Sequence, residues 1–281
     1  MTLEQVQQKR AAVLRPELRK DNGNAPATAA LSIGRVGKSF SLNGSPREIL
    51  RDVSFTVGKG EIVGVLGASG CGKSTLLRLI VGLDQDYSGR IAVSGEETRG
   101  LNRDVAMVFQ DHRLFPWLTV AGNVGLALEA LDLPGKEKAD RIRHYVDLVG
   151  LSDYIDAYPK QLSGGMAQRA AIARALVSEP NILLMDEPFG ALDSLLRLRL
   201  QDELLRIWDR NNVSIVVVTH DIEEALYLSD RVIVLEANPG RIHSVIDVGL
   251  DRPRLRDDPH IVSLKRQCLE LVLDPPARIT S

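Results

Sequence analysis

A run of nine residues constrains the fold of this 281-residue chain more than any other feature of the sequence. Residues 67–75 read Gly-Ala-Ser-Gly-Cys-Gly-Lys-Ser-Thr. An apolar run at 61–66 precedes them, and apolar residues at helical spacing follow at 76–81. A strand, a glycine loop and a helix in this order form the context in which G-x-x-x-x-G-K-[ST] binds phosphate. That context disfavours the alternative, a glycine-rich turn that binds nothing.

The residue types in this loop match the chemistry of phosphate binding. Gly67, Gly70 and Gly72 are expected to take backbone angles that substituted residues resist, so that successive N–H groups turn inward around an anion. The helix that begins near Lys73 adds unpaired N–H groups and the positive end of its dipole. Lys73 supplies a positive charge for the β- and γ-phosphates, and the hydroxyl of Ser74 can hold Mg²⁺.

The rest of the chain is predicted to contain strands and helices in alternation. Strands are expected at 31–40, 49–57, 61–66, 90–93, 105–109, 182–185, 213–219 and 232–235, and helices at 76–81, 119–131, 136–149, 162–176, 195–208 and 221–228. The first two strands alternate apolar and polar residues, as at the margin of a sheet, with a turn at 43–46. The last three strands are continuously apolar, which indicates a parallel sheet covered by helices on both faces.

Both ends of the chain are expected to lie outside the main domain, which we place at 31–250. Residues 1–30 form an N-terminal extension, in which 5–19 has the pattern of a weak helix. A helical subdomain is inserted at about 111–170. Residues 251–281 form a charged, proline-bearing C-terminal appendage with a short amphipathic stretch at 261–273.

The composition narrows the possible partners. Hydrophobic residues make up 44% of the chain, enough for a sizeable core, and the net charge of -2 gives no basic footprint for nucleic acid. The two cysteines, Cys71 and Cys268, are too few for a disulfide framework, which fits a reducing compartment. No stretch approaches the roughly 18–20 apolar residues of a membrane helix, and the N-terminus lacks the apolar core of a signal peptide. Any membrane role is therefore expected to come through a partner.

Two acidic residues follow one of the apolar strands. Asp186 and Glu187 come directly after 182–185, and ligands of open parallel sheets bind at the carboxyl ends of the strands. Asp186 then suits the Mg²⁺ shell, and Glu187 can act as the general base for the water that attacks the γ-phosphate. The alternative is a pair of acidic residues that ends the strand without any chemistry.

Two other strand ends also carry polar residues. His220 follows the strand at 213–219, where contact with the γ-phosphate competes with the commoner role of a surface or core histidine. Gln110 follows the strand at 105–109, where its amide can ligate Mg²⁺ or orient water, or can simply mark a helix boundary.

A second helix start also has the features of an anion site. Ser163, Gly164 and Gly165 open the helix that runs to Leu176, and a helix N-terminus attracts anions. Ser163 can equally be an ordinary N-cap. Because the chain already has one phosphate loop, a second such terminus suggests a nucleotide shared between two chains.

Taken together, these motifs resemble the ATPase subunits of ABC transporters. The resemblance covers roughly residues 31–250 and rests on Gly67 to Thr75, Gln110, Leu162-Ser-Gly-Gly-Met166, Leu184-Met-Asp-Glu-Pro188, Ala191-Leu-Asp193 and His220. It implies an α/β fold with a P-loop NTPase (RecA-like) core, a mainly parallel sheet, an antiparallel β margin and the inserted helical subdomain. Two departures are visible: Phe40 stands where the family often has Tyr, and Met166 replaces a common Gln.

The resemblance also implies the roles of individual residues. Two subunits would form a head-to-tail homodimer that encloses two ATP molecules, each between one phosphate loop and the partner's Ser163 to Gly165. Phe40 would stack on adenine, and Asp193 would couple the two sites. The residues expected to contact ATP are Phe40, Gly67, Ala68, Ser69, Gly70, Cys71, Gly72, Lys73, Ser74, Thr75, Ser163, Gly164, Gly165 and Asp193. The residues expected to hold Mg²⁺ are Ser74, Gln110 and Asp186, and the catalytic residues are Lys73, Gln110, Glu187 and His220.

A finer resemblance concerns the transported solute. Phe109-Gln-Asp-His-Arg-Leu-Phe-Pro-Trp117 and Leu192-Asp-Ser-Leu-Leu196 look like the nitrate/sulfonate/taurine importer group, and most like the aliphatic sulfonate importers. This implies an ATP-hydrolysing subunit that drives uptake of a small anionic solute, an aliphatic sulfonate first and nitrate or taurine next. The implied partners are an integral membrane permease, whose coupling helix the segment 110–117 would receive, and indirectly a solute-binding protein outside the membrane. The subunit would then lie peripherally at the cytoplasmic face of the inner membrane.

Two other functions compete with transport. A non-transport ABC protein in translation or DNA repair is disfavoured by the single nucleotide domain, the absence of a long coiled-coil insertion and the lack of a basic face. An unrelated P-loop kinase or GTPase would not account for Leu162-Ser-Gly-Gly165 or His220.

Overall fold

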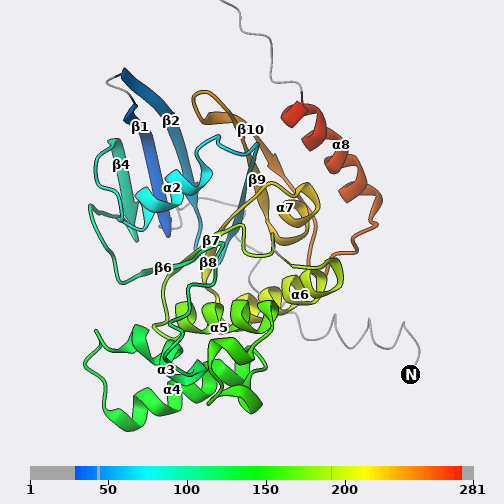
Figure 1. Cartoon of the computed structure of the whole chain (residues 1–281). Coiled ribbons are helices and arrows are strands. Elements are labelled where there is room, and N and C mark those ends of the chain that lie inside the picture. The colour runs from blue at the N-terminus through cyan, green and yellow to red at the C-terminus, as the bar shows by residue number, and fades with distance from the viewer. Residues whose placement is uncertain (1–28, 43–44, 191, 274–281) are drawn as a thin grey trace, which may run out of the picture.

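The computed structural model describes residues 29–42, 45–190 and 192–273, and these residues form two sheets with helices around them (Figure 1). The antiparallel sheet has the order β2-β1-β4-β5. Its strands are β1 (Leu31–Leu42), β2 (Ser45–Val57), β4 (Ser88–Val93) and β5 (Glu96–Glu97). Ser45 and Pro46, expected in a turn, already belong to β2. The expected helix at 5–19 lies outside the described residues.

The second sheet is the parallel sheet that the apolar runs predict. Its order is β10-β9-β3-β8-β7-β6, and only the pair β10–β9 is antiparallel. The strands are β3 (Ile62–Gly67), β6 (Val105–Val108), β7 (Ile182–Asp186), β8 (Ser214–Thr219), β9 (Arg231–Glu236) and β10 (Arg241–Asp247). Every residue of β3, β7 and β8 is buried, as expected for strands covered on both faces.

Helices cover both faces of this parallel sheet. They are α2 (Lys73–Ile80), α3 (Val120–Gly125), α4 (Gly135–Leu148), α5 (Gly164–Leu176), α6 (Ser194–Asn211), α7 (Ile222–Leu228) and α8 (Pro259–Leu273). Side chains of β7 and β8 alternate between two cores. Met185 and Val217 pack in the core that contains α5 and α6, whereas Leu184 and Val216 pack in the core that contains α2 and the antiparallel sheet. The sheet therefore separates α2 from α5.

The helical segment between β6 and β7 is inserted as expected, but its first helix is short. In place of one helix at 119–131, the chain forms α3 and a 3₁₀ turn at Leu126–Leu128. Gly122 and Gly125 lower the helix propensity of this stretch, and Pro134 precedes the first turn of α4. Two further 3₁₀ turns, at Ser152–Tyr154 and Pro159–Gln161, lead into α5.

The C-terminal part of the chain adds two elements beside β9 and α7. Strand β10 was not expected, because its sequence lacks an apolar run, and all but one of its side chains are exposed or only partly buried. Helix α8 agrees with the amphipathic stretch at 261–273. Its residues Ile261, Leu264 and Cys268 share a core with α7, β9 and the end of β3. Among the described residues, no helix combines the length and the apolarity that a membrane span requires.

Candidate active site

The loop at 67–75 joins β3 to α2, and two of its glycines have left-handed backbones. Gly70 has φ 81° and Gly72 has φ 102°, which only glycine adopts without strain. Gly67 differs from the expectation, because its φ is not in that region. A Cβ at Gly67 would lie 2.7 Å from Cys71 Sγ and 2.8 Å from the carbonyl oxygen of Leu235. Gly67 is therefore required by close packing rather than by an unusual backbone.

Lys73 lies inside this loop and is only 5% exposed. Its Nζ donates hydrogen bonds to the carbonyl oxygens of Gly67 at 2.8 Å and Ala68 at 3.1 Å. The same Nζ lies 4.0 Å from Oε1 of Glu187. The ammonium thus links the phosphate loop to the end of β7.

Asp186 ends β7 next to the start of α2. Its Oδ1 accepts a hydrogen bond of 2.9 Å from the hydroxyl of Ser74. Burial raises the pKa of Asp186, and the hydrogen bond from Ser74 partly offsets that rise. A hydroxyl and a buried carboxylate at this spacing are oxygen ligands of the kind that Mg²⁺ prefers, so the two residues fit that ion.

Glu187 has a backbone conformation that is rare for a residue with a side chain. Its φ is 44°, and its N–H donates to the carbonyl of Val218 on the adjacent strand at 2.9 Å. The carboxylate lies 3.1 Å from Nδ1 of His220 and 4.0 Å from Nζ of Lys73. The structure thus brings together three of the four residues predicted to be catalytic.

Gln110, the fourth, lies at the same edge of the sheet but is exposed. Strand β6 pairs in parallel with β7, and Val108 is opposite Met185. Gln110 therefore follows β6 at about the level of Glu187. Its side chain forms no hydrogen bond with the other described residues.

Phe40 and Thr75 line one cavity of about 510 Å³. Its other lining residues are Arg78, Leu83, Asp84, Gln85 and Asp86, none of which is among the predicted site residues. The alternation of side chains along a strand places Lys38 on the same face of β1 as Phe40, which indicates a neighbour of the ring but not the cavity itself. Nothing in the sequence pointed from β1 to the loop after α2.

Ser163 and Asp193 both act as N-caps in this structure. Ser163 accepts from the N–H of Met166 at 3.3 Å, and Asp193 accepts from the N–H of Leu196 at 3.0 Å. Ser163 and Gly164 are exposed, whereas Gly165 packs against Leu196. Helix α5 lies across the sheet from α2, so a single chain does not bring Ser163 to its own phosphate loop.

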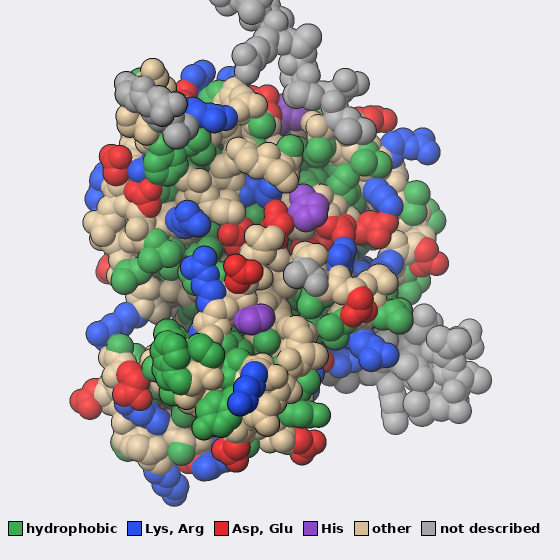
Figure 2. Space-filling view, in the orientation of Figure 1, with side chains coloured by type: hydrophobic (Ala, Val, Ile, Leu, Met, Phe, Trp, Pro, Cys, Tyr) green, Lys and Arg blue, Asp and Glu red, His purple; other side chains and the backbone are tan. Residues whose placement is uncertain are grey.

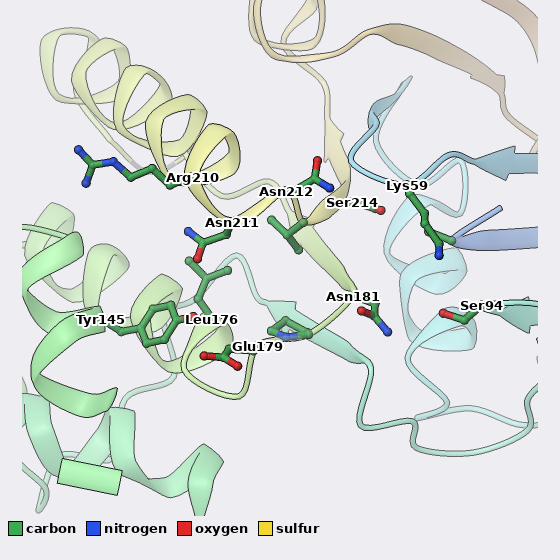
Figure 3. A pocket seen from close by; sticks show the side chains of 13 residues that line it. Lys59, Ser94, Tyr145, Leu176, Glu179, Asn181, Arg210, Asn211, Asn212 and Ser214 are labelled. Carbon is green, nitrogen blue, oxygen red and sulfur yellow. The ribbon is translucent and has the colours of Figure 1, made fainter. Parts of the chain in front are cut away.

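A second cavity, of about 520 Å³, lies at the opposite edge of the sheet (Figure 3). Its lining includes Lys59, Asn181 and Ser214, which stand at or before the starts of β3, β7 and β8. It contains none of the predicted site residues. The phosphate loop and the polar residues around it lie instead at the carboxyl ends of the strands, as the sequence predicts.

This arrangement is that of a P-loop ATPase: a phosphate loop faces an acid and a histidine at the end of a parallel sheet. A family model described as "ABC transporter" matches residues 50–190. Similar proteins include the aliphatic sulfonates import ATP-binding protein SsuB of Bacillus cereus, 45% identical over 85% of this chain and 94% of that protein. The corresponding protein of Xanthomonas axonopodis is 48% identical over 82% of this chain and 90% of that protein.

The chain belongs to the ABC transporter family, in which it is an ATP-binding and ATP-hydrolysing cassette. Among solved structures, it resembles a dimeric, post-hydrolysis ATP-binding cassette bound to ADP and Pi. That similarity has a TM-score of 0.70 and 32% identity, and covers 79% of this chain and 100% of the other. A second structure, cbiO1 of Clostridium perfringens, which is part of the ABC transporter complex cbiONQ, has a TM-score of 0.71 and 26% identity, covering 79% of this chain and 89% of the other.

Proposed function

We propose that this chain is the ATP-hydrolysing subunit of an importer for aliphatic sulfonates, with residues 31–250 as its ATPase domain. One observation carries the ATPase part: Glu187 lies 3.1 Å from His220 and 4.0 Å from Lys73, beside the phosphate loop. The names of its relatives support the sulfonate part. Nitrate and taurine are the next candidates.

In this proposal, the loop N–H groups and Lys73 bind the phosphates of ATP, and Phe40 stacks on the adenine. The cofactor Mg²⁺, held by Ser74, Asp186 and Gln110, would neutralise phosphate charge. With a proton on Nδ1, His220 donates to Glu187 and fixes the carboxylate.

Glu187 then accepts a proton from the attacking water. As the new oxygen–phosphorus bond forms, the bond from the γ-phosphorus to the bridging oxygen breaks, which yields ADP and phosphate.

The exposed start of α5 supports a head-to-tail homodimer. Ser163 and Gly164 are exposed on the side of the sheet away from α2, where a partner's phosphate loop can reach them. Each ATP would then lie between one loop and the partner subunit's helix start, and Asp193 would contact the opposite site. The similar cassette bound to ADP and Pi is dimeric.

Exposed aromatic residues on the helical segment support a permease partner. Trp117 is 69% exposed and Phe115 is 42% exposed, with their ring centroids 5.4 Å apart. Figure 2 shows hydrophobic side chains grouped on the helical segment in this view. We assign to residues 110–117 the binding of the coupling helix of an integral membrane permease. The subunit would be peripheral at the cytoplasmic face, and a solute-binding protein would act through the permease.

The test is copurification from membranes, followed by ATPase assays on the reconstituted complex with its solute-binding protein. Aliphatic sulfonates should stimulate hydrolysis more than taurine or nitrate do. Lys73→Ala should abolish both ATP binding and stimulated turnover, because it removes the buried ammonium from the loop. If nitrate alone stimulates ATP hydrolysis, the transported solute is nitrate and not a sulfonate. Normal transport by Lys73→Ala would contradict the assigned ATP site.

A further inference from the structure

We propose that Lys38 positions Phe40 for the nucleotide base, covering one face of the ring so that adenine stacks on the other. This inference rests on the proposed function, because it requires ATP at the phosphate loop. It adds a residue to the base site that neither the motifs nor the comparisons assign.

Lys38 is a lysine held almost entirely inside the protein. It is 5% exposed and lies on β1, one residue past the last pair that β1 forms with β4. Its Nζ donates to Oδ1 of Asp84 at 2.9 Å, to the carbonyl oxygen of Asp86 at 2.5 Å and to Oδ2 of Asp86 at 3.3 Å. Burial opposes the charged form, but the two aspartates together raise the pKa of Lys38. The ammonium is therefore charged at neutral pH and fixed in place.

The same ammonium lies over the ring of Phe40, with Nζ 4.8 Å from the ring centroid. A cation within about 6 Å of an aromatic face is attracted by the ring quadrupole. Phenylalanine has no hydroxyl through which a hydrogen bond could orient the ring. Because Phe40 is 42% exposed, contact with a fixed cation is a direct way to restrict its rotamer.

The geometry of the cavity explains why one lysine matters for binding. Phe40 forms one wall and the loop at 83–86 forms another, and Thr75 connects the cavity to the phosphate loop. Lys38 contacts both walls, through the ring of Phe40 and through Asp84 and Asp86. In this inference, a base that enters from the side of Thr75 stacks on the face of Phe40 that Lys38 does not cover.

The experiment compares binding of ATP with binding of inorganic tripolyphosphate, a probe that lacks the base. Lys38→Met should weaken ATP binding by about three- to fivefold, the scale of an exposed cation–π contact. It should leave tripolyphosphate binding unchanged. Lys38→Arg should restore most of the ATP affinity, and Lys59→Met, at an exposed lysine elsewhere, serves as the matched control.

A double-mutant cycle separates positioning of the ring from a purely structural role. In a Phe40→Ala background, Lys38→Met should cause no further loss of ATP affinity. Equal losses for ATP and tripolyphosphate, or a full additional loss in that background, would overturn the inference. If Lys38→Met does not fold, Asp86→Asn provides the second variant, since the exposed carboxylate of Asp86 can be changed without burying a new group. It should also weaken ATP binding selectively, and an unchanged ATP affinity would count against the role of Lys38.

The same binding data distinguish a failure of the proposed function from a failure of the role proposed for Lys38. A wild-type protein that fails to bind ATP contradicts the proposed function and this inference with it. A wild-type protein that binds ATP, with a Lys38→Met variant of equal affinity, contradicts this inference alone.

Discussion

The residue Glu187 combines a strained backbone with a polar surrounding. A residue with a side chain at φ 44° costs on the order of 1–3 kcal/mol, and this conformation persists only where the surrounding structure holds it. Here the hydrogen bond to Val218 holds the backbone, and the conformation aims the carboxylate at His220 and Lys73. The strain is located at the group for which the proposed reaction needs a fixed orientation.

Another carboxylate, Glu224, lies on the helix that begins just after His220. It is 3% exposed, and its Oε2 accepts a hydrogen bond from Gln201 Nε2 at 3.2 Å. Burial raises the pKa of Glu224 to about 7, although Thr219, Gln201 and Arg197 favour the charged form. Asp221, at the start of the same helix, opposes ionisation of Glu224.

Glu224 therefore predicts a specific dependence of stability on pH. A folded-state pKa above that of the unfolded chain means that the folded protein binds the extra proton. The stability is then fully present below about pH 4.5 and is lost as the pH rises towards 7. We expect the unfolding free energy of Glu224→Gln, relative to the wild type, to increase through this window by at most about 3 kcal/mol. Denaturant titrations at pH 5 and 8 measure this change, and an equal difference at both pH values would contradict the shift.

Single residues could be predicted from the sequence where the motif was local. Lys73, Ser74, Asp186, Glu187 and His220 each stand beside the element that positions them, so their meeting followed from the topology of a parallel sheet. Contacts between distant segments carried no such signal. Lys38 meets Asp84 and Asp86 only because β1 lies beside the loop after α2, and no periodicity in either segment indicates that pairing.

At the scale of elements, the connection from β6 to α3 is held from two sides. Asn123 is fully buried, and its Nδ2 donates to the carbonyl oxygens of Phe115, Leu118 and Thr119 at 3.0–3.1 Å. From α5, Arg174 donates to the carbonyls of His112 and Arg113 at 3.0 and 2.8 Å. The segment that contains Trp117 is thus hydrogen-bonded to α5, the helix that Ser163 caps.

Apolar patterns predicted the elements of the sheet better than those of the helical segment. The buried strands β3, β7 and β8 have few alternatives, since continuous apolar runs must be covered. Strand β10 pairs at an edge through its backbone, and its side chains give little pattern. The apolar spacing at 119–131 correctly predicted a helix, but α3 is shorter than predicted because of two glycines and the downstream Pro134.

The braced segment gives a prediction about partner contact. Trp117→Cys should form a cross-link to the permease with a thiol reagent, because this side chain is 69% exposed. The native Cys71 and Cys268 are buried and should not react. Asn123→Ala in the same background should reduce the cross-linking yield severalfold, since three carbonyls lose their donor. Val262→Cys, on α8 and 53% exposed, is the control. Cross-linking from Val262 but not from Trp117 would place the permease at the C-terminal helix instead.

At the scale of the whole molecule, the parallel sheet divides the proposed site between two chains. The phosphate loop and α2 lie with the antiparallel sheet, and α5 lies on the other face with α6. In the proposed dimer, each subunit therefore contributes one half of a nucleotide site at each of two surfaces. Closure would need a second copy, and ATP itself would be the main contact between the halves.

This division predicts that ATP controls the oligomeric state. Glu187→Gln removes the proposed base but keeps the loop and the start of α5, so it should form a stable dimer with ATP and a monomer with ADP. Size-exclusion chromatography with light scattering measures both states. Adding Gly164→Arg provides a matched variant. A Cβ at Gly164 meets nothing within 4 Å, so the chain should fold. The new side chain would, however, occupy the space in which the partner's nucleotide is proposed to bind. The double variant should bind ATP and remain monomeric. A dimer that forms equally well with Arg at 164, or a Glu187→Gln monomer that hydrolyses ATP at the wild-type rate, would show that the two helix starts do not share one nucleotide.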